Sequence, residues 1–326
     1  MMEENAFVQR IDLGALSTAV DAIRKEIGKV IVGQREMVDM LLIGLLCDGH
    51  ILIEGVPGVA KTLTAKLVAK IIDADFSRIQ FTPDLMPSDV LGTSVFNPRD
   101  AEFQFKRGPI FSNIILIDEI NRAPAKTQAA LFEVMEERQI TIDGITHLMD
   151  FPFIVLATQN PIEQEGTYRL PEAQLDRFLF KINVNYPTLE EEIHILLQQQ
   201  SMGQNALLGD VNTVITTAQI AEYRALIQQV LIDIKLVEFI ARIVNETRNN
   251  SSLFLGASPR ASLAILKAAK ASAAIKGRDF VTPEDVLEMA APVMRHRIIL
   301  TPEKEMEGTT PDELVRNIIA NIEVPR

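Results

Sequence analysis

The sequence predicts an α/β core built on a parallel β-sheet, followed by a smaller all-helical domain. Short apolar runs alternate with helical stretches up to residue 187, and this alternation is typical of parallel strands joined by helices. Beyond that point only the helical spacing of apolar residues continues. We therefore expect a core at residues 1–187, which includes N-terminal helices, and a helical domain at residues 188–326.

The first 30 residues are expected to be helical because their apolar residues recur three or four positions apart. Short runs rich in Ile, Leu, Val and Phe then predict strands. These runs lie at residues 51–54, 114–117, 153–157 and 180–184, with a weaker one at 78–81. Together they predict a parallel sheet of five strands flanked by helices.

Two β-hairpins are expected to interrupt this pattern. Residues 93–96 and 102–105 flank an Asn-Pro-Arg-Asp turn. Residues 139–142 and 145–148 flank an Asp-Gly pair, which tight two-residue hairpins prefer. Each hairpin is either a working part or a decorative insertion.

In the second domain, three helices are expected to begin at a capping residue followed by proline, which is accepted at the first helical position. These starts are Ser258-Pro259, Thr282-Pro283 and Thr301-Pro302. A short basic run, Arg295-His296-Arg297, is interpreted as a solvated helix face.

Composition excludes several classes of function. The 32 Lys and Arg residues are outnumbered by 44 Asp and Glu, and the net charge of −12 disfavours a general nucleic-acid binder. Cys47 is the only cysteine, so no internal disulfide or thiolate metal cage can form. The start of the chain lacks the features of a secretory signal, and no apolar run is long enough to span a membrane. We expect a cytoplasmic protein without membrane insertion.

A phosphate-binding loop is predicted at residues 55–62, Gly-Val-Pro-Gly-Val-Ala-Lys-Thr, between a strand and a helix. Backbone N–H groups at a helix start can converge on phosphate oxygens when side chains are small. Lys61 would then reach the β- and γ-phosphates of ATP, and the Thr62 hydroxyl would bind Mg²⁺. Ala60 stands where glycine is usual, and its methyl group is tolerable if its φ is negative. The residues assigned to ATP contact are Gly55, Gly58, Val59, Ala60, Lys61, Thr62 and Leu63.

Two adjacent acids, Asp118 and Glu119, end the apolar strand at 114–117. Ligands of parallel α/β sheets lie beyond the C-terminal strand ends, where these side chains would emerge. Asp118 would hold Mg²⁺ through its water shell, and Glu119 would orient and deprotonate the attacking water. Such acids can also be solvated loop charges, but here they follow a phosphate-binding loop by about 60 residues.

With both motifs present, the chain resembles the MoxR family of AAA+ ATPases over nearly its whole length. The motifs that carry the resemblance are residues 31–34 (IVGQ), 55–62 (GVPGVAKT), 116–123 (LIDEINRA), 157–161 (ATQNP) and 170–178 (LPEAQLDRF). The resemblance implies a P-loop AAA+ core with β-hairpin inserts and a smaller all-α lid domain. In relatives such inserts line the central face of the ring, so Phe96, Phe103 and Phe105 either contact a partner or pack within the hairpin. It also implies ATP and Mg²⁺ as cofactors and a homo-oligomeric ring, with six subunits expected.

Further site residues follow from the resemblance. Asn160 matches the polar sensor that positions the attacking water, although an asparagine before proline is also common in turns. Arg177 matches the arginine finger that reaches the nucleotide of a neighbouring subunit, unless it forms a surface ion pair with Asp176 or Glu172. Arg169 could share this role. Val32 and Gly33 match the segment that lines the adenine pocket.

Arg260 is placed by a physical argument as well as by resemblance. It would lie in the first turn of the helix that Ser258-Pro259 begins, where the helix dipole disfavours a cation. An anionic partner would stabilise it there. The resemblance identifies that partner as the nucleotide phosphate and Arg260 as the second sensor on the lid, although a carboxylate would serve equally.

Three functions are weighed. The first is ATP hydrolysis coupled to remodelling or maturation of a protein partner, such as metal-cofactor insertion or complex assembly; the resemblance implies a partner with a von Willebrand A domain. The second is an AAA+ motor stimulated by nucleic acid, which the acidic composition disfavours. The third is a nucleotide-gated scaffold with negligible turnover, for which Glu119, Asn160 and Arg177 would be unnecessary.

Overall fold

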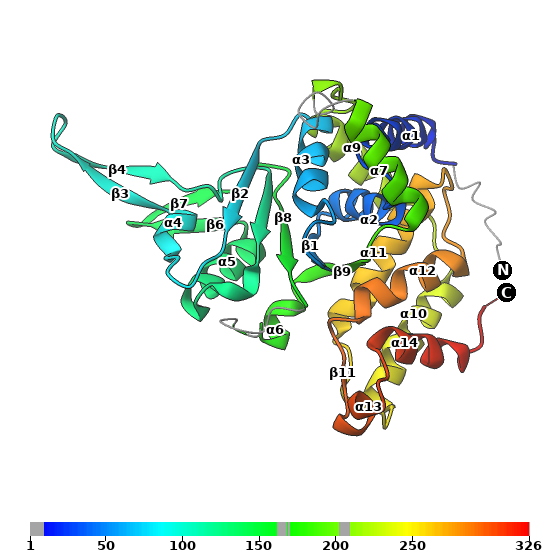
Figure 1. Cartoon of the computed structure of the whole chain (residues 1–326). Coiled ribbons are helices and arrows are strands. Elements are labelled where there is room, and N and C mark those ends of the chain that lie inside the picture. The colour runs from blue at the N-terminus through cyan, green and yellow to red at the C-terminus, as the bar shows by residue number, and fades with distance from the viewer. Residues whose placement is uncertain (1–9, 162–167, 169, 202–208, 326) are drawn as a thin grey trace, which may run out of the picture.

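The core is a five-stranded parallel sheet in the order β2-β5-β8-β1-β9, as predicted. The computed structural model describes residues 10–161, 168, 170–201 and 209–325 (Figure 1). The strands are β1 (His50–Gly55), β2 (Phe76–Gln80), β5 (Ile114–Asp118), β8 (Ile154–Gln159) and β9 (Phe178–Val184). Every neighbouring pair is parallel. The five predicted runs therefore form the sheet, each shifted by two residues at most.

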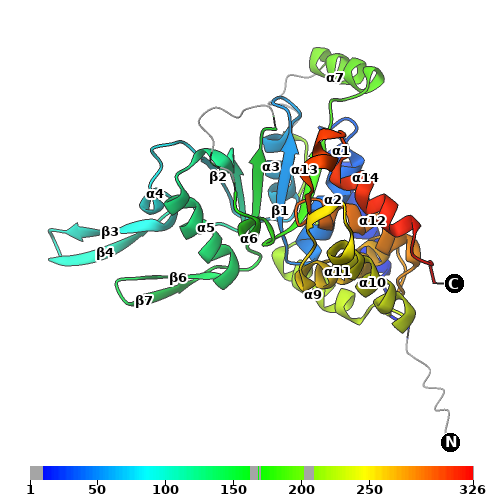
Figure 2. The same cartoon turned by 90° about the horizontal axis from the view of Figure 1, so that it is seen from below.

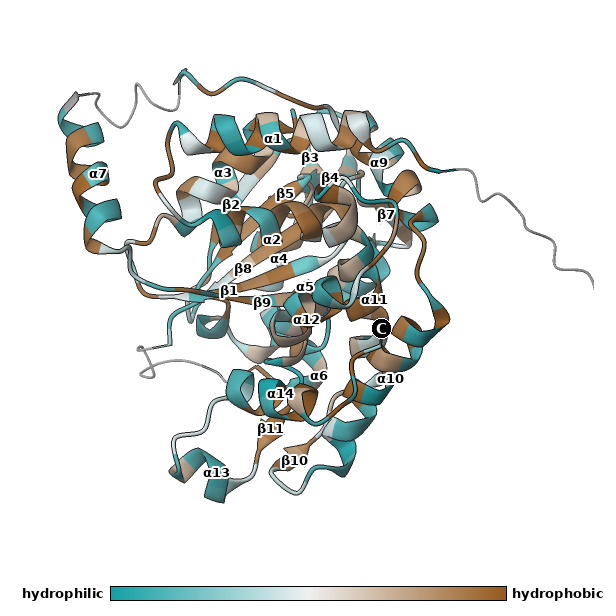
Figure 3. Cartoon of the chain, turned by 90° about the vertical axis from the view of Figure 1, so that its right-hand side faces the viewer, coloured by the Kyte–Doolittle hydropathy of each residue, from teal (hydrophilic) through white to brown (hydrophobic). Residues whose placement is uncertain are grey.

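Helices cover both faces of the sheet, and alternate strand residues pack against each side. Ile51 and Ile53 of β1 join one apolar cluster, whereas Leu52 joins the other. This follows from the two-residue period of a strand. Figure 3 shows β1 and β8 as apolar ribbons inside the molecule. The helices of this domain are α1 (Gly14–Gly28), α2 (Arg35–Leu46), α3 (Lys61–Ile71), α4 (Pro87–Leu91), α5 (Ala125–Glu137) and α6 (Glu172–Leu175), with a 3₁₀ turn at Ile120–Arg122.

Both predicted hairpins are present and extend to the same side of the molecule (Figures 1 and 2). They are β3 (Gly92–Asn97) with β4 (Glu102–Arg107), and β6 (Gln139–Ile142) with β7 (Ile145–Leu148). Ser94 of the first hairpin donates a hydrogen bond to the Asp143 carboxylate at the turn of the second. The ring of Phe105 lies 4.6 Å from that of His147, centroid to centroid. The two hairpins are thus joined at two points.

The three hairpin phenylalanines differ in their surroundings. Phe105 packs inside, next to His147 and Phe111. Phe96 and Phe103 contact one another, with ring centroids 5.3 Å apart, and Phe103 remains 71% exposed. Phe96 and Phe103 thus form a cross-strand pair within the hairpin that leaves both rings exposed, whereas Phe105 packs against the core and the second hairpin.

The second domain is predominantly helical. Its described helices are α7 (Leu189–Ser201), α9 (Thr217–Gln229), α10 (Ile234–Asn249), α11 (Pro259–Ile275), α12 (Pro283–Met294), α13 (Pro302–Met306) and α14 (Pro311–Ala320). The three predicted helix starts open α11, α12 and α13. A short antiparallel pair, β10 (Leu253–Leu255) with β11 (Ile299–Leu300), is an addition that the sequence patterns did not indicate. In the described ranges, no helix is long and apolar enough to cross a membrane.

The interpretation of Arg295-His296-Arg297 as a solvated face is wrong. Arg297 is buried and forms an ion pair with Asp176, with Nε 2.7 Å from Oδ1. Its Nη2 donates to the Phe178 carbonyl at 2.6 Å, and His296 bonds the same oxygen through Nε2 at 2.9 Å. The run turns inward because β9 is an edge strand whose carbonyls need donors. It thereby attaches the helical domain to the sheet.

His50 connects three elements near the start of β1. The Val155 N–H donates to its Nδ1 at 3.0 Å, so its Nε2 carries the proton and donates to the Met135 carbonyl at 3.1 Å. Burial and the nearby Arg138 charge lower the pKa of His50 to about 3. Burial also lowers the pKa of His296. Both rings therefore stay neutral in the folded protein.

This neutrality predicts a pH-dependent stability. The folded-state pKa of each ring lies below the unfolded value of about 6.5, so the unfolded chain binds protons that the folded chain excludes. Stability should therefore fall as pH drops below about 6.5, by up to about 1.4 kcal/mol per pH unit for each histidine. The thermal unfolding midpoint of the wild type and of His50→Asn, which keeps an acceptor near the Nδ1 position, should be compared at about pH 7.5 and 5.5. The variant should show the shallower dependence, and identical slopes would contradict the role of His50.

Candidate functional site

The phosphate-binding loop follows β1 and leads into α3, as predicted. Gly58 has a φ of 90°, a value that favours glycine. The condition set for Ala60, a negative φ, is not met, because its φ is 57°. This left-handed geometry turns the chain into α3, whose first residue is Lys61. It costs about 1–2 kcal/mol for a residue with a Cβ, which explains why glycine is usual here.

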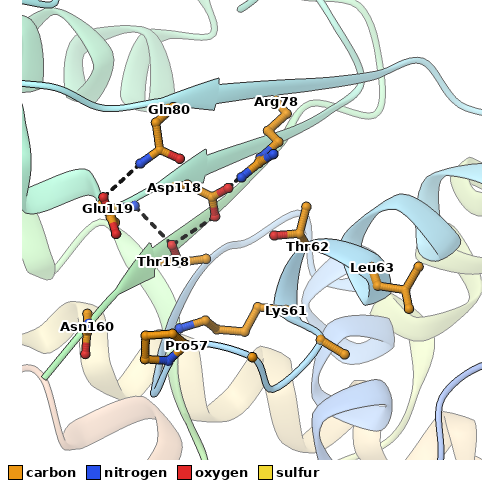
Figure 4. A pocket seen from close by; sticks show the side chains of 12 residues that line it. Pro57, Lys61, Thr62, Leu63, Arg78, Gln80, Asp118, Glu119, Thr158 and Asn160 are labelled. Atoms are coloured by element: carbon orange, nitrogen blue, oxygen red, sulfur yellow. Dashed lines mark hydrogen bonds and ion pairs between the residues drawn. The ribbon is translucent and has the colours of Figure 1, made fainter. Parts of the chain in front are cut away.

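A cavity of about 390 Å³ lies beside this loop (Figure 4). Most of the predicted phosphate and metal residues line it together. The lining residues are Pro57, Gly58, Ala60, Lys61, Thr62, Leu63, Arg78, Gln80, Asp118, Glu119, Thr158 and Asn160. Two of the loop residues predicted to contact ATP are absent from the lining: Gly55 ends β1 beside Val184, and Val59 is buried in the core.

Lys61 is held back toward its own loop, where its ammonium donates to the carbonyl of Gly55. Burial lowers the pKa of Lys61, while the negative charges of Asp118 and Glu119 act in the opposite direction. A partly desolvated cation in a polar cavity gains from an anionic ligand. The surroundings of Lys61 therefore suit a phosphate group.

The two acids at the end of β5 are each bound by a side chain from β2 (Figure 4). Arg78 Nε lies 2.6 Å from Asp118 Oδ2, and Gln80 Nε2 donates to Glu119 Oε2 at 2.8 Å. Arg122 also pairs with Glu119 Oε2, at 3.0 Å from its Nε. Asp118 is only 7% exposed, and neither acid is the freely solvated loop charge of the alternative interpretation.

Strand β8 brings two more polar groups to the same place. Thr158 Oγ1 donates to Asp118 Oδ1 at 3.1 Å and accepts the backbone N–H of Glu119 at 3.0 Å. One hydroxyl thus fixes both acids. Asn160 follows the last residue of β8 and lines the cavity, as the sequence predicted.

The oxygen donors of the cavity fit a magnesium ion. Mg²⁺ prefers oxygen ligands and is commonly bound by one or two protein oxygens together with substrate phosphates and water. The Thr62 hydroxyl and the Asp118 carboxylate both line the cavity beside Lys61. Arg78 also supplies a positive charge next to Asp118.

Val32 and Gly33 line a different cavity, of about 630 Å³, together with residues of α1 and α2. The Gln34 side chain donates from Nε2 to the carbonyl of Val59 at 3.0 Å. This bond joins the predicted adenine segment to the phosphate-binding loop. The segment that lines the second cavity is therefore bonded to the loop that lines the first.

Neither Arg177 nor Arg260 lines the phosphate cavity. Both pair with Glu136 in the last turn of α5: Arg260 Nη2 lies 2.9 Å from Oε1, and Arg177 Nε lies 3.7 Å from Oε2. A carboxylate thus partners Arg260 within the chain, which is the alternative that the helix-dipole argument left open. Arg169 lies outside the described residues.

Sequence reasoning missed Arg78, Gln80 and Thr158 as site residues. All three occupy strands whose register with β5 brings them beside the acids; Gln80 pairs with Asp118 across β2 and β5. Arg78 and Gln80 are two residues apart and so share a face of β2. For Arg78 and Gln80, the sequence signal that could have identified them was a polar residue at every second position of a predicted strand.

Comparison with known proteins identifies relatives over nearly the whole chain. Residues 50–180 match the ATPase family associated with various cellular activities (AAA), and residues 245–318 match the AAA lid domain. The chain is 44% identical to Chaperone MoxR1 of Mycobacterium tuberculosis, over 92% of this chain and 81% of that protein. It is 30% identical to Protein MoxR of Paracoccus denitrificans, over 91% and 93%. A crystal structure of a protein described as an ATPase, from Cytophaga hutchinsonii, matches with a TM-score of 0.88 at 44% identity, covering 96% and 97%.

Replacing Thr158 tests whether its hydroxyl organises the two acids. Thr158→Val keeps the shape of the side chain but removes both hydrogen bonds, of which the one to the Asp118 carboxylate contributes about 1.5–3 kcal/mol. Nucleotide affinity should change little, while turnover of ATP should fall about ten- to a hundredfold. Thr127→Val is a matched control, because it loses a hydrogen bond to the Leu85 carbonyl away from the acids. Equal effects in the two variants would show a general loss of packing instead.

Proposed function

The chain belongs to the MoxR family of AAA+ ATPases, and we propose that it hydrolyses ATP in a Mg²⁺-dependent reaction that remodels or matures a partner protein. The observation that carries this proposal is the common cavity shared by Lys61, Asp118, Glu119 and Asn160. These residue types serve phosphate binding, metal binding, proton abstraction and water positioning.

The proposed reaction uses the residues of this cavity in separate roles. Lys61 and the loop N–H groups bind the β- and γ-phosphates, and Leu63 contacts the nucleotide beside Thr62. Thr62 and Asp118 hold Mg²⁺, which when bound neutralises charge on the phosphates. Glu119 takes the proton of the attacking water, and Asn160 orients that water. Gln80 and Arg122 limit the positions open to Glu119, because both contact its Oε2 atom.

The remaining roles concern ATP and the neighbouring subunits. Val32 and Gly33 bind the adenine, and Gln34 links their segment to the phosphate loop. Arg260 is the lid sensor, and Arg177 is the finger that completes the site of an adjacent subunit in a ring of six. In this proposal the core ends near residue 187 and the lid begins at residue 188.

The proposed partner is a client protein, recruited with a protein that carries a von Willebrand A domain, and the proposed location is the cytoplasm. The exposed Phe96–Phe103 pair of the first hairpin is the proposed contact with the client. A motor on nucleic acid is the weaker alternative, since the net charge is −12. A scaffold that binds ATP without turnover is weaker as well, because the contacts that orient Glu119 would then serve no purpose.

Two variants should separate ATP binding from hydrolysis. Lys61→Ala removes the phosphate-directed cation and should lose tight ATP binding, measured by calorimetry or a fluorescent nucleotide. Glu119→Gln keeps a similar shape without the base; it should bind ATP yet hydrolyse it about 10²- to 10⁴-fold more slowly. Normal turnover in Glu119→Gln would rule out the base role, and unchanged affinity in Lys61→Ala would rule out the phosphate loop.

The ring mechanism predicts that activity depends on protein concentration. If Arg177 completes the site of a neighbour, ATP turnover per subunit should rise as subunits assemble. Turnover and size should be measured over the same concentration series with Mg²⁺ present. Substantial turnover by a species that elutes as a monomer would contradict completion of the site by a second subunit.

A further inference from the structure

Helix α5 connects the proposed catalytic acid to the proposed arginine finger. It begins at Ala125, shortly after the Glu119–Arg122 segment, and ends at Glu137. The Glu136 carboxylate in its last turn contacts Arg177 through Oε2 and Arg260 through Oε1. One side chain therefore serves both arginines whose proposed roles concern the nucleotide.

The charges of Glu136 and Arg260 are each unfavourable within their own helices. The C-terminal end of α5 carries partial negative charge, which disfavours an acid, and its last turn contains no basic residue. Arg260 lies in the first turn of α11, where a cation is disfavoured. Their ion pair at 2.9 Å offsets both effects. The acid at residue 136 is thus unfavourable for its own helix and is compensated by the arginine of the other helix.

Arg177 is fixed to α5 at two points but keeps an unused donor. Its Nη1 donates to the carbonyl of Phe132, one turn before Glu136. Its Nε is buried and lacks a hydrogen-bond partner among the described residues, because Glu136 Oε2 lies 3.7 Å away. A buried N–H without an acceptor costs free energy. The bond to Phe132 therefore orients this guanidinium, while its Nε still lacks a hydrogen-bond acceptor among the described residues.

We propose that Glu136 is a positioning residue that holds Arg177 and Arg260 in a fixed relation for ATP hydrolysis. This inference rests on the proposed finger role of Arg177. The carboxylate restricts the rotamers of a long side chain, so that less conformational entropy is lost when the arginine meets a phosphate. Through α5, the orientation of the finger is also tied to the chain segment that carries Glu119.

Glu137 provides a matched control for Glu136. It is the next residue of the same helix end, is exposed, and forms no ion pair within the described part of the chain. Substitution to glutamine changes the charge equally at both positions. An effect of the helix dipole or of net charge would therefore be shared, whereas an effect on the arginines belongs to position 136 alone.

The test compares the steady-state kinetics of the full-length variants Glu136→Gln, Glu136→Asp, Glu137→Gln and Arg177→Ala under conditions where the wild type is assembled. Glu136→Gln should lower kcat at least tenfold and leave the KM for ATP within about twofold, since the phosphate loop is untouched. Glu136→Asp should recover part of kcat, and Glu137→Gln should match the wild type. Because the Glu136 pairs are partly exposed, thermal stability should change little.

Each contrary outcome identifies what fails. Wild-type turnover in Glu136→Gln, with Arg177→Ala inactive, would overturn the positioning role and leave the finger intact. Wild-type turnover in Arg177→Ala would overturn the finger role and the inference with it. Equal losses in Glu136→Gln and Glu137→Gln would assign the effect to charge at the helix end. If Glu136→Gln unfolds, Arg260→Gln breaks the same ion pair by changing the arginine instead of the acid. An unchanged kcat in Arg260→Gln would contradict the proposal that Glu136 positions both arginines.

Discussion

The parallel register of β1, β5 and β8 is the constraint on which the rest of the site depends. Ile117 of β5 pairs with Ala157 of β8, and Glu54 of β1 pairs with Gln159 of the same strand. Parallel strands end at the same edge of a sheet, so the phosphate loop, the two acids and Asn160 meet there although about 100 residues separate the first from the last. A slip of one residue in any of these pairings would turn the polar side chains to the opposite face.

The sheet, the hairpins and the helix starts could be predicted because each depends on a local pattern. Strands show as apolar runs, turns as Asn-Pro or Asp-Gly, and helix starts as a capping residue with proline. What could not be predicted depends on contacts distant in sequence. Arg297 is read locally as a surface charge, but the carbonyls of β9, about 120 residues away in the sequence, draw it inside.

The same distinction applies within the site. Lys61, Asp118 and Glu119 lie in motifs with characteristic spacing. Arg78 lies in no such motif, and only the register between β2 and β5 brings it beside Asp118. The φ of Ala60 was also beyond local reasoning. An alanine is normally placed at negative φ, and the turn from β1 into α3 overrides that preference.

The charged groups of the cavity have polar partners within the chain. Asp118 has Arg78, Glu119 has Arg122 and Gln80, and Lys61 has the carbonyl of Gly55. A ligand must therefore exchange existing contacts for new ones, which favours groups that match several partners at once. A triphosphate with its metal has this property, because it presents both anionic oxygens and a cation.

The two joined hairpins have a mechanical consequence. The Ser94–Asp143 bond and the Phe105–His147 contact tie the ribbons together at one level of the first hairpin, because Ser94 and Phe105 are cross-strand partners. The strands of the first hairpin continue beyond this level to the Phe96–Phe103 pair. The second hairpin leads directly from α5 and into β8. A displacement of the Phe96–Phe103 end would thus pass to the second hairpin at the level of Ser94 and Phe105, and from there to α5 and β8.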